Sequence, residues 1–481
     1  MIAMRNSLIL IALVLVPVAA QPADLYATTT SYEVFGGTAQ IQMAPPWSST
    51  LDEYQIHSDA VVRDYNDRWV FIVNRLYGDN ILVLDRNSGY GVVTQYSVAA
   101  TGLNPRDIHV APSAGPASAP GRAFIPLYES NLLLVCDALS GNNVVTIDLS
   151  TFADADGLCE MDRLVELPAS PGHPSGRLAL SLQNMDRSGS TWIPTDAAQL
   201  VLIDIATESL IDADPVAPGM QGIDLQLTNP FWRLSYGAVA GGWKILVNCT
   251  GQYGVQDGGI EMVDPWTMQS DGVLFSEAQL GGDLLDFALL GQTIGWAIRS
   301  DASFRTQLVR FDPSTGLVQQ VVLSSSGFDL SDLEMSYDAR LFVGDRAASN
   351  PGIRVYDPVS GALIAGPLDT GLPPFDFTLL DEIPVSVPPL RLDARLTARP
   401  NPFNPRVVIR LPLADAPGES MLEILDLRGR LVQRLAASRD DAGLRWVWDG
   451  RNRDGAAVAS GSYFARAVGV DTPPARLTLV R

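Results

Sequence analysis

Short apolar runs with strand-like patterning recur along most of this chain. Clear examples are Trp69–Val73, Ile81–Leu84 and Gly352–Tyr356. Turn-forming residues separate the runs at close intervals, and the period of about 3.6 residues typical of helices is almost absent. Brief apolar runs between turn signals are typical of β-strands. The pattern therefore predicts an all-β fold.

One repeated feature is an apolar strand that ends in aspartate and is followed by a turn rich in Gly, Ser and Pro. Aspartate can cap a tight turn with its own carboxylate, and glycine supplies a positive φ, so each example predicts a β-hairpin. The aspartates of this first marker are Asp85, Asp137, Asp204, Asp264, Asp312 and Asp357.

A second marker precedes each hairpin and consists of an aspartate that opens a short apolar strand. Its seven aspartates are Asp59, Asp107, Asp162, Asp224, Asp286, Asp332 and Asp376. Successive members lie 48, 55, 62, 62, 46 and 44 residues apart. This period predicts one four-stranded propeller blade per repeat.

The two ends of the repeat region complement each other. Six repeats run whole from Asp59 to about residue 372, whereas Asp376 has only one strand after it. Strand-like segments at Leu25–Thr30 and Thr38–Met43 supply the missing partners, and a closed ring removes exposed sheet edges. We predict a seven-bladed β-propeller over residues 24–381, closed by N- and C-terminal strands. Because the third and fourth repeats carry insertions, a propeller of six or eight blades is also compatible with the pattern.

The repeat region resembles the YVTN-type, surface-layer-like propellers of exported bacterial proteins. The segments that carry the resemblance are HSDAVVRDYNDRWVFIVNR, NPRDIHV, IDLSTFADADGLCEMDRL and LQNMDRSGSTWIPTD. The YVTN tetrapeptide itself is replaced by Phe71-Ile72-Val73-Asn74. The resemblance covers roughly residues 24–380 and implies a binding or scaffold module without naming a ligand.

A proline-rich linker over residues 382–398 leads to a segment of different composition. Residues 391–481 hold 15 Arg against 10 Asp and Glu, although the whole chain has a net charge of −21. Regular strands with Gly and Asp turns predict a small Ig-like β-sandwich over residues 399–481.

This C-terminal segment resembles the sorting domain of type IX secretion cargo and the related FlgD-like Ig-like module. The matching residues are Asn401, Pro402, Phe403, Asn404 and Pro405, then Asp426–Arg430, then Trp448, Asp449, Gly450 and Arg451, and last Ala459–Phe464. The resemblance implies that outer-membrane secretion machinery recognises the domain. A plain Ig-like spacer is the alternative.

The first 20 residues have the pattern of a signal peptide. Arg5 precedes an apolar run, Leu8–Val16, which is too short to span a bilayer, and Val18-Ala19-Ala20 resembles a cleavage site. We therefore expect export to the outside or the outer surface of a Gram-negative-type bacterium, with no transmembrane span in the mature chain. The net negative charge argues against nucleic acid as a partner.

Few residues offer chemistry. The three cysteines show no spacing typical of a metal site, and one disulfide among them is possible. The sequence contains none of the familiar catalytic motifs. The histidines are His57, His109 and His173; the first two lie two residues from a second-marker aspartate, so both can approach the central channel, whereas His173 has no evident partner. The second-marker aspartates either gather at the channel and bind a cation such as Ca²⁺ or bond backbone N–H groups locally.

A second acidic cluster contains Asp154, Asp156 and Glu160. It resembles part of a calcium loop without the EF-hand spacing, and an acidic surface loop is the alternative. Trp192 and Tyr253 lie in the insertions and are candidates for a binding surface on one face.

These features support three functions. The first is an exported module that binds a protein, a glycan or a small molecule and has no enzymatic activity. The second is a metal-dependent hydrolase or lyase that works in an acidic funnel with His57 and His109. The third is a structural component of the envelope. The ligand and the oligomeric state are not predicted.

Overall fold

The computed structural model describes residues 23–113, 119–169, 173, 175–195, 197–239, 242–380, 396–411, 421–425, 431–436, 438–440, 443–453, 455–467 and 475–480. The predicted signal peptide, most of the linker and Asp426–Arg430 lie outside these residues. Strands dominate, and the helices of the described part are α1 (Glu277–Leu280) and the 3-10 turns η1 (Arg86–Ser88) and η2 (Ser150–Phe152). None of its helices has the length and apolar character that crossing a membrane requires.

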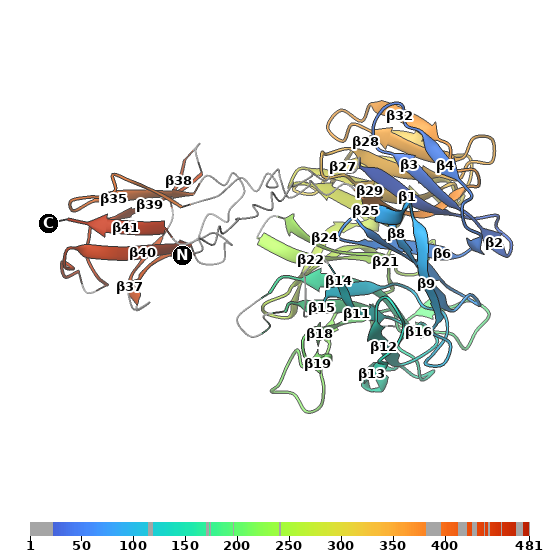
Figure 1. The fold of residues 1–481 in the computed structure, drawn as a ribbon, viewed down its shortest axis with the longest axis horizontal. Coiled ribbons are helices and arrows are strands. Elements are labelled where there is room, and N and C mark those ends of the chain that lie inside the picture. Colours follow the sequence, from blue (N-terminus) through green and yellow to red (C-terminus); the bar gives the residue numbers. More distant parts are fainter. Residues whose placement is uncertain are drawn as a thin grey trace, which may run out of the picture.

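The large unit, residues 23–380, contains consecutive antiparallel sheets that we number along the chain (Figure 1). Sheet 1 contains β6 (Ala60–Tyr65), β7 (Trp69–Asn74), β8 (Asn80–Asp85) and β9 (Gly91–Ser97). Sheet 2 contains β10 (His109–Pro112), β11 (Pro120–Ile125), β12 (Leu132–Asp137) and β13 (Val145–Asp148). Sheet 3 contains β14 (Met161–Leu167), β15 (Arg177–Leu182), β18 (Gln199–Asp204) and β19 (Ser209–Ile211), and β20 (Ile223–Asp224) also pairs with β18.

The remaining sheets of the large unit follow the same order. Sheet 4 contains β21 (Pro230–Val239), β22 (Gly242–Cys249), β23 (Gly259–Asp264) and β24 (Gln269–Ser276). Sheet 5 contains β25 (Asp283–Leu290), β26 (Ile294–Ser300), β27 (Thr306–Asp312) and β28 (Leu317–Ser324). Sheet 6 contains β29 (Leu330–Met335), β30 (Leu341–Asp345), β31 (Gly352–Tyr356) and β32 (Leu363–Leu368). Two short two-stranded sheets also belong to this unit: β2 (Phe35–Gly36) with β5 (Ile56–His57), and the hairpin of β16 (Met185–Asp186) and β17 (Ile193–Pro194).

Sheet 7 joins the two ends of the large unit. Its order is β33 (Pro374–Leu380), β1 (Asp24–Thr29), β3 (Thr38–Gln42) and β4 (Ser49–Leu51). The antiparallel register pairs Asp24 with Leu380 and Thr28 with Asp376. In Figure 1 the blue strands β3 and β4 accordingly lie beside orange strands from the end of the unit.

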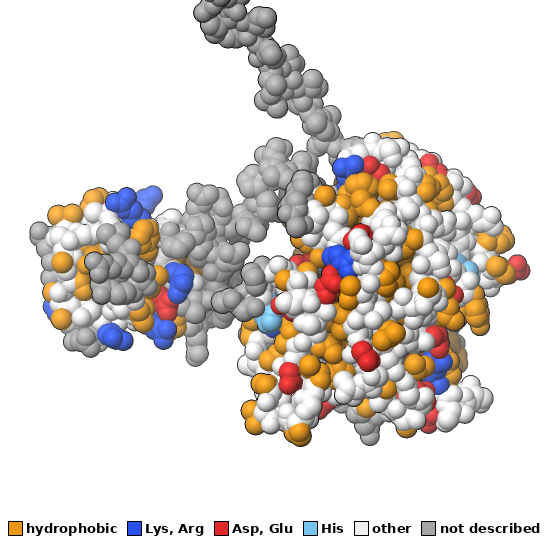
Figure 2. Space-filling view, turned by 60° about the horizontal axis from the view of Figure 1, so that its bottom comes forward, with side chains coloured by type: hydrophobic (Ala, Val, Ile, Leu, Met, Phe, Trp, Pro, Cys, Tyr) orange, Lys and Arg blue, Asp and Glu red, His pale blue; other side chains and the backbone are white. Residues whose placement is uncertain are grey.

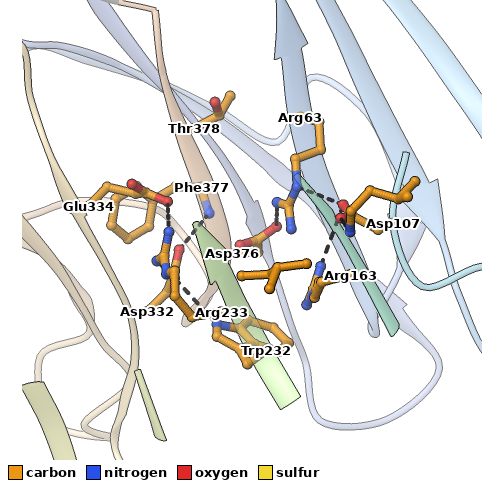
Figure 3. A pocket seen from close by; sticks show the side chains of 12 residues that line it. Arg63, Asp107, Arg163, Trp232, Arg233, Asp332, Glu334, Asp376, Phe377 and Thr378 are labelled. Atoms are coloured by element: carbon orange, nitrogen blue, oxygen red, sulfur yellow. Dashed lines mark hydrogen bonds and ion pairs between the residues drawn. The ribbon is translucent and has the colours of Figure 1, made fainter. Parts of the chain in front are cut away.

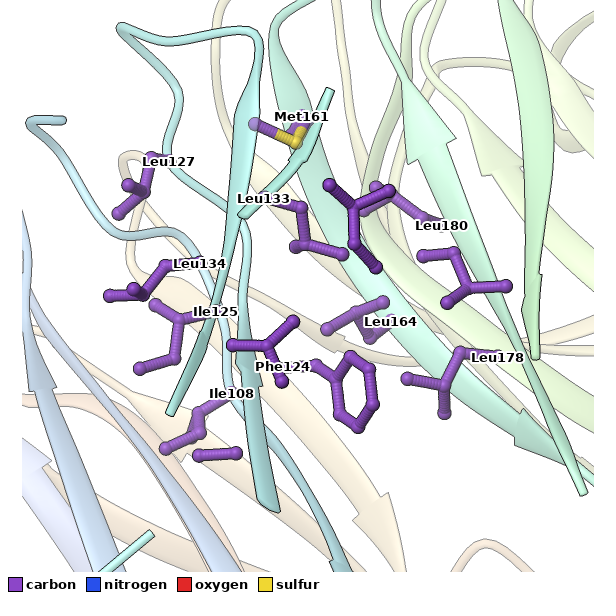
Figure 4. Close-up of a cluster of buried hydrophobic side chains, with 14 of the residues drawn as sticks. Ile108, Phe124, Ile125, Leu127, Leu133, Leu134, Met161, Leu164, Leu178 and Leu180 are labelled. Carbon is purple, nitrogen blue, oxygen red and sulfur yellow. The ribbon is translucent and has the colours of Figure 1, made fainter. Parts of the chain in front are cut away.

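Hydrophobic side chains from neighbouring sheets pack against one another. Sheets 2 and 3, for example, share a cluster in which Phe124 and Leu133 face Leu164 and Leu178, all at most 9% exposed (Figure 4). A similar cluster joins sheets 6 and 7 through Phe342 and Phe377. Each such buried side chain contributes about 1.5–3 kcal/mol relative to an exposed one. Consecutive four-stranded sheets packed face to face make the large unit a β-propeller.

The first marker forms the turn between the third and fourth strands of several sheets. In sheet 5 the carboxylate of Asp312 accepts a hydrogen bond from the N–H of Ser314 at 2.9 Å, and Gly316 follows with φ 67°. Asp357 and Gly361 repeat this arrangement in sheet 6, with φ 74° at the glycine. A side chain with a Cβ is strained at such φ values, which explains the glycine.

The small unit, residues 396–480, has two sheets. One contains β34 (Thr397–Arg399), β35 (Val407–Leu411), β39 (Gly443–Trp448) and β38 (Ser438–Asp440), in that order. The other contains β37 (Leu431–Ala436), β36 (Met421–Leu425), β40 (Gly461–Ala467) and β41 (Ala475–Leu479). Both sheets contribute to one hydrophobic core, so they form a small β-sandwich.

Candidate functional site: the centre of the large unit

Aspartates of the second marker bond the innermost strand of the next sheet. The N–H of Leu164 donates to Asp107 at 3.0 Å, that of Trp232 to Asp162 at 2.9 Å, and that of Leu333 to Asp286 at 3.0 Å. The N–H groups of Phe377 and Val62 donate to Asp332 at 3.3 Å and to Asp376 at 2.7 Å. These five carboxylates therefore join neighbouring sheets, whereas the local interpretation placed each bond within its own strand.

Arginines link the two pairs of neighbouring sheets that these five Asp-to-N–H bonds do not link. Between sheets 1 and 2, Nε of Arg63 donates to Asp107 at 2.8 Å. Between sheets 4 and 5, Arg233 binds both oxygens of Asp286, at 2.7 and 2.9 Å. The five Asp-to-N–H bonds and these two ion pairs together link every consecutive pair of sheets, including sheet 7 to sheet 1.

Acidic and basic side chains line a cavity of about 110 Å³ between the innermost strands (Figure 3). Arg63 lies between Asp107 and Asp376, with its second contact at 2.9 Å. Arg233 reaches Asp332 at 3.3 Å and Glu334 at 2.6 Å. Figure 2 shows basic and acidic side chains next to each other near the middle of the visible face of the unit. The centre is therefore an alternating network of charges.

Burial and neighbouring charges raise the pKa values of some carboxyl groups in this network and lower that of another. Burial raises the pKa of the Asp332 carboxyl well above its usual range, and the nearby Asp376 and Asp286 raise it further. Burial also raises the pKa of Glu334, against the opposing effect of Arg233. The pKa of Asp162 is instead lowered, because Arg106 and Arg163 outweigh the effect of its burial.

The arginines are the residues that sequence reasoning missed. Arg63, Arg163 and Arg233 lie on innermost strands, and Arg106 directly precedes Asp107; Arg106 pairs with Asp162 at 2.8 Å. The guanidinium of Arg163 lies 4.5 Å from the ring centre of Trp232. A signal was available for Arg106 and Arg163, which lie directly beside the marker aspartates Asp107 and Asp162, but no marker aspartate lies beside Arg63 or Arg233.

Two aspartates of the second marker lie elsewhere. Asp224 does not open an innermost strand: it belongs to β20, is exposed, and accepts a hydrogen bond from Gln199 at 2.6 Å. The inner strand of sheet 4 is β21, which begins six residues later and carries no aspartate. Asp59 pairs with Arg75, whose charge lowers the pKa of the Asp59 carboxyl in spite of its burial.

The histidines do not line the central cavity. His57 accepts a hydrogen bond from the N–H of Asp59 at 3.2 Å. His109 lies 3.4 Å from Glu166, and burial lowers its pKa to about 4. His173, for which the sequence suggested no partner, contacts Asp204 at 2.5 Å. This correction reflects a contact between a loop and a strand 31 residues apart, which sequence spacing does not reveal.

The carboxylates of the second acidic cluster accept hydrogen bonds from backbone N–H groups. Asp154 accepts a hydrogen bond from the N–H of Asp156, and Asp156 from that of Leu158, both at 3.0 Å. Glu160 accepts from the N–H of Met185 at 3.1 Å. Within the described ranges, no three His, Cys, Asp or Glu side chains are arranged to hold a metal ion. The arginine-paired carboxylates of the centre likewise do not fit a Ca²⁺ site.

Several residues of the predicted sorting motif make contacts within the small unit. Asn401 exchanges hydrogen bonds with β41, to the carbonyl of Arg476 and from the N–H of Thr478, both at 2.8 Å. Phe403 and Tyr463 contact the buried ring of Trp448, with ring centres 5.6 and 5.1 Å away. Asp449 accepts a hydrogen bond from the N–H of Arg451 at 3.2 Å, and Gly450 has φ 70°. Pro402, Asn404 and Pro405 lie in the same segment as Phe403.

Comparison by sequence finds no match among protein-family models or curated proteins. Among solved structures, the chain is similar to dihydro-heme d1 dehydrogenase NirN in complex with DHE, with 14% identity and a TM-score of 0.45 over 75% of each chain. Hydrazine synthase from Kuenenia stuttgartiensis has 12% identity and a TM-score of 0.43 over 66% of this chain and 87% of its own. A functionally unknown protein from Desulfotomaculum acetoxidans has 11% identity and a TM-score of 0.44 over 74% and 99%. Likenesses this distant leave the ligand and the chemistry to be argued from this chain's own residues.

Proposed function

We propose that this chain is an exported binding or scaffold protein. In this proposal the large unit is a seven-bladed propeller that presents its loops to a ligand, and the small unit is an Ig-like sorting domain. The observation that carries the binding role is the set of bonds at the centre. Because the central carboxylates are bonded to backbone N–H groups and to arginines, the centre holds the sheets together and the loops remain as the surface for a ligand.

The blade count rests on the same bonds. Seven connections join seven sheets in sequence, and the last of them, from Asp376 to Val62, returns to sheet 1. An eighth blade would have to separate two sheets that are already bonded. Six blades would leave one of the four-stranded sheets outside the ring.

Delivery by the small unit rests on its motif residues. Asn401 fastens the beginning of the unit to its last strand, and Phe403 and Trp448 meet in its core. These contacts support a self-contained sandwich, as a module recognised by secretion machinery requires. The localisation that we propose is the outer surface of a bacterium with a type IX system, or the medium around it.

Delivery is tested by expressing the full chain and a chain without residues 391–481 in such a bacterium. We expect protease to digest the full chain on intact cells, whereas the shortened chain stays folded in the periplasm. A third chain, whose tail is replaced by an unrelated Ig-like sandwich of equal length, controls for a spacer effect. Equal surface exposure of all three chains would contradict the sorting role.

The binding role is tested against the hydrolase alternative by elemental analysis of the purified full chain. We expect less than about 0.1 equivalent of any divalent metal, because the central carboxylates are paired with arginines. A stoichiometric metal that survives dialysis, and that is lost when Asp332 and Glu334 are changed to Asn and Gln, would overturn the proposal in favour of the metal-dependent enzyme.

A further inference from the structure

A cleft outside the centre of the large unit combines an exposed indole with polar groups. It has a volume of about 370 Å³ and is lined by Asp156, Leu158, Arg187, Ser188 and Trp192. This volume lies in the range of small-molecule sites. Its walls come from two connections of sheet 3, residues 149–160 before β14 and residues 183–198 between β15 and β18.

Hydrogen bonds hold the two walls together. Nδ2 of Asn184, in the second connection, donates to the carbonyl of Phe152 in the first at 3.1 Å. The N–H of Met185 donates to the carboxylate of Glu160 at 3.1 Å. In the hairpin of β16 and β17, Arg187 directly follows the first strand and Trp192 directly precedes the second. The cleft is therefore formed before any ligand arrives, which reduces the entropy cost of binding.

The indole of Trp192 is held in place and still open to a ligand. Its ring lies nearly parallel to that of the buried Tyr128, at 14° and with 6.2 Å between centres. The Arg187 guanidinium lies 4.6 Å from the Trp192 ring centre. Trp192 nevertheless remains 46% exposed. A fixed aromatic surface of this kind favours a ligand with an apolar face.

The charges around the cleft disfavour ionic ligands. A cation is disfavoured because the positive charge of Arg187 already lies 4.6 Å from the ring centre of Trp192 and 5.8 Å from that of Tyr128. Arg187 is itself paired with Glu129 at 2.7 Å and lies 3.5 Å from Glu160. These two carboxyl groups offset the charge of the guanidinium, and Asp156 also lines the cleft, which disfavours an anion. A neutral ligand with hydroxyl groups remains.

We propose that this cleft binds a neutral oligosaccharide. One face of a pyranose ring carries C–H groups and packs on the exposed indole of Trp192, while ring hydroxyls bond to the carboxylate of Asp156 and to the hydroxyl of Ser188. Hydrogen bonds to a charged group are the stronger kind, so Asp156 sets the orientation of the sugar. This inference specifies the ligand class for the proposed binding function and rests on it.

The test uses the purified full chain and four neutral probes: cellotetraose, maltotetraose, mannotetraose and chitotetraose in its N-acetylated form. We expect at least one probe to change the tryptophan fluorescence and to give a binding isotherm by calorimetry below about 1 mM. Trp192→Ala should weaken that binding at least tenfold, and Asp156→Asn should weaken it severalfold. Thermal unfolding checks that both variants remain folded.

Trp266→Ala is the matched control. Trp266 is 50% exposed and also carries a stacked arginine, Arg177, at 4.9 Å from its ring centre, but it lies outside the cleft. We expect Trp266→Ala to bind the sugar as the unaltered chain does. Failure of all four probes at about 10 mM, or binding by Trp192→Ala within twofold of the unaltered chain, would overturn the inference. Neither result bears on delivery, which is measured in cells on the small unit.

Discussion

The carboxylate of Asp376 accepts a hydrogen bond from the backbone N–H of Val62, 314 residues earlier in the chain, at 2.7 Å. The same oxygen, Oδ2, lies 2.9 Å from the guanidinium of Arg63. One side chain therefore joins sheet 7 to sheet 1 through both a neutral and a charged donor. Four other aspartates make the neutral contact between other sheets, so this residue type has a repeated structural role.

Asp376→Ala tests that role. The substitution leaves the N–H of Val62 without an acceptor and removes one of the two carboxylates paired with Arg63. We expect the free energy of unfolding to fall by about 2–4 kcal/mol. Asp224→Ala is the control, because Asp224 carries the same sequence marker but is exposed and accepts a hydrogen bond from Gln199 of its own sheet. Its expected cost is within about 0.5 kcal/mol. Urea unfolding measures both, and equal costs would contradict the role of the inter-sheet bond.

Arg233→Met tests the charge balance of the centre. Its removal leaves Asp286, Asp332 and Glu334 facing one another, and we expect a loss of about 3–5 kcal/mol at pH 8. The loss should shrink towards pH 5, because the raised pKa values of Asp332 and Glu334 allow these groups to take up protons. Arg305→Gln removes an exposed pair with Asp301 and should cost at most about 1 kcal/mol. A loss from Arg233→Met that does not depend on pH would contradict the explanation.

Glu160 gives the fold a pH dependence of known sign. Burial is the main cause that raises the pKa of its carboxyl from 4.5 to about 7. The folded state therefore favours the protonated form, so the contribution of Glu160 to stability is complete below about pH 4.5 and is lost as the pH rises through 7. Glu160→Gln, which resembles the protonated form, should be more stable than the unaltered chain above pH 7 by roughly 1–3 kcal/mol. The gain should vanish near pH 4.

The control for this prediction is Glu33→Gln, since Glu33 is exposed. Its stability at pH 7 should differ from that of the unaltered chain by at most about 0.5 kcal/mol in the same series of urea titrations. A gain for Glu160→Gln that is equally large at pH 4 would mean that packing, and not protonation, is responsible.

The three thiols should be unreactive in the folded chain. Cys136, Cys159 and Cys249 are free and buried, and burial raises the pKa of the first two to about 11 and 12. The thiolate is the reactive form, so a disulfide-exchange reagent should label none of them within an hour at pH 7.5 and all three in guanidinium. Only one reactive thiol after unfolding would reveal a disulfide between the other two.

Much of the large unit could be predicted because its signals are local. The first marker combines an aspartate cap with a glycine at positive φ, and the spacing of the second marker follows the length of a four-stranded sheet. Asp224 misled because a long connection before β21 contains a segment that imitates an inner strand. The true inner strand, β21, has no marker aspartate. Its Trp232, with φ 68°, donates its N–H to Asp162 of sheet 3, and Arg233 binds Asp286 of sheet 5.

The chemistry of the centre could not be predicted from the aspartates alone. Their positions suggested an acidic funnel, but Arg63 and Arg233 reach them from strands 44 and 53 residues away along the chain. Such pairing depends on how neighbouring sheets face each other, and no local pattern in the sequence records that. Sequence reasoning named Trp192 as a candidate for a binding surface but not the cleft around it, because Tyr128 meets Trp192 through tertiary packing.

The pairing of β1 with β33 has a consequence for synthesis of the chain on the ribosome. Strand β1 emerges before the other strands of the large unit, and its partner follows roughly 350 residues later. At about 5–20 residues per second, that delay lasts roughly 20–70 s. During this time one edge of β1, whose six residues are all buried in the finished fold, has no strand to pair with. A nascent chain that stops between β1 and residue 374 can never complete this sheet, so it retains an open edge that chaperones and proteases can recognise.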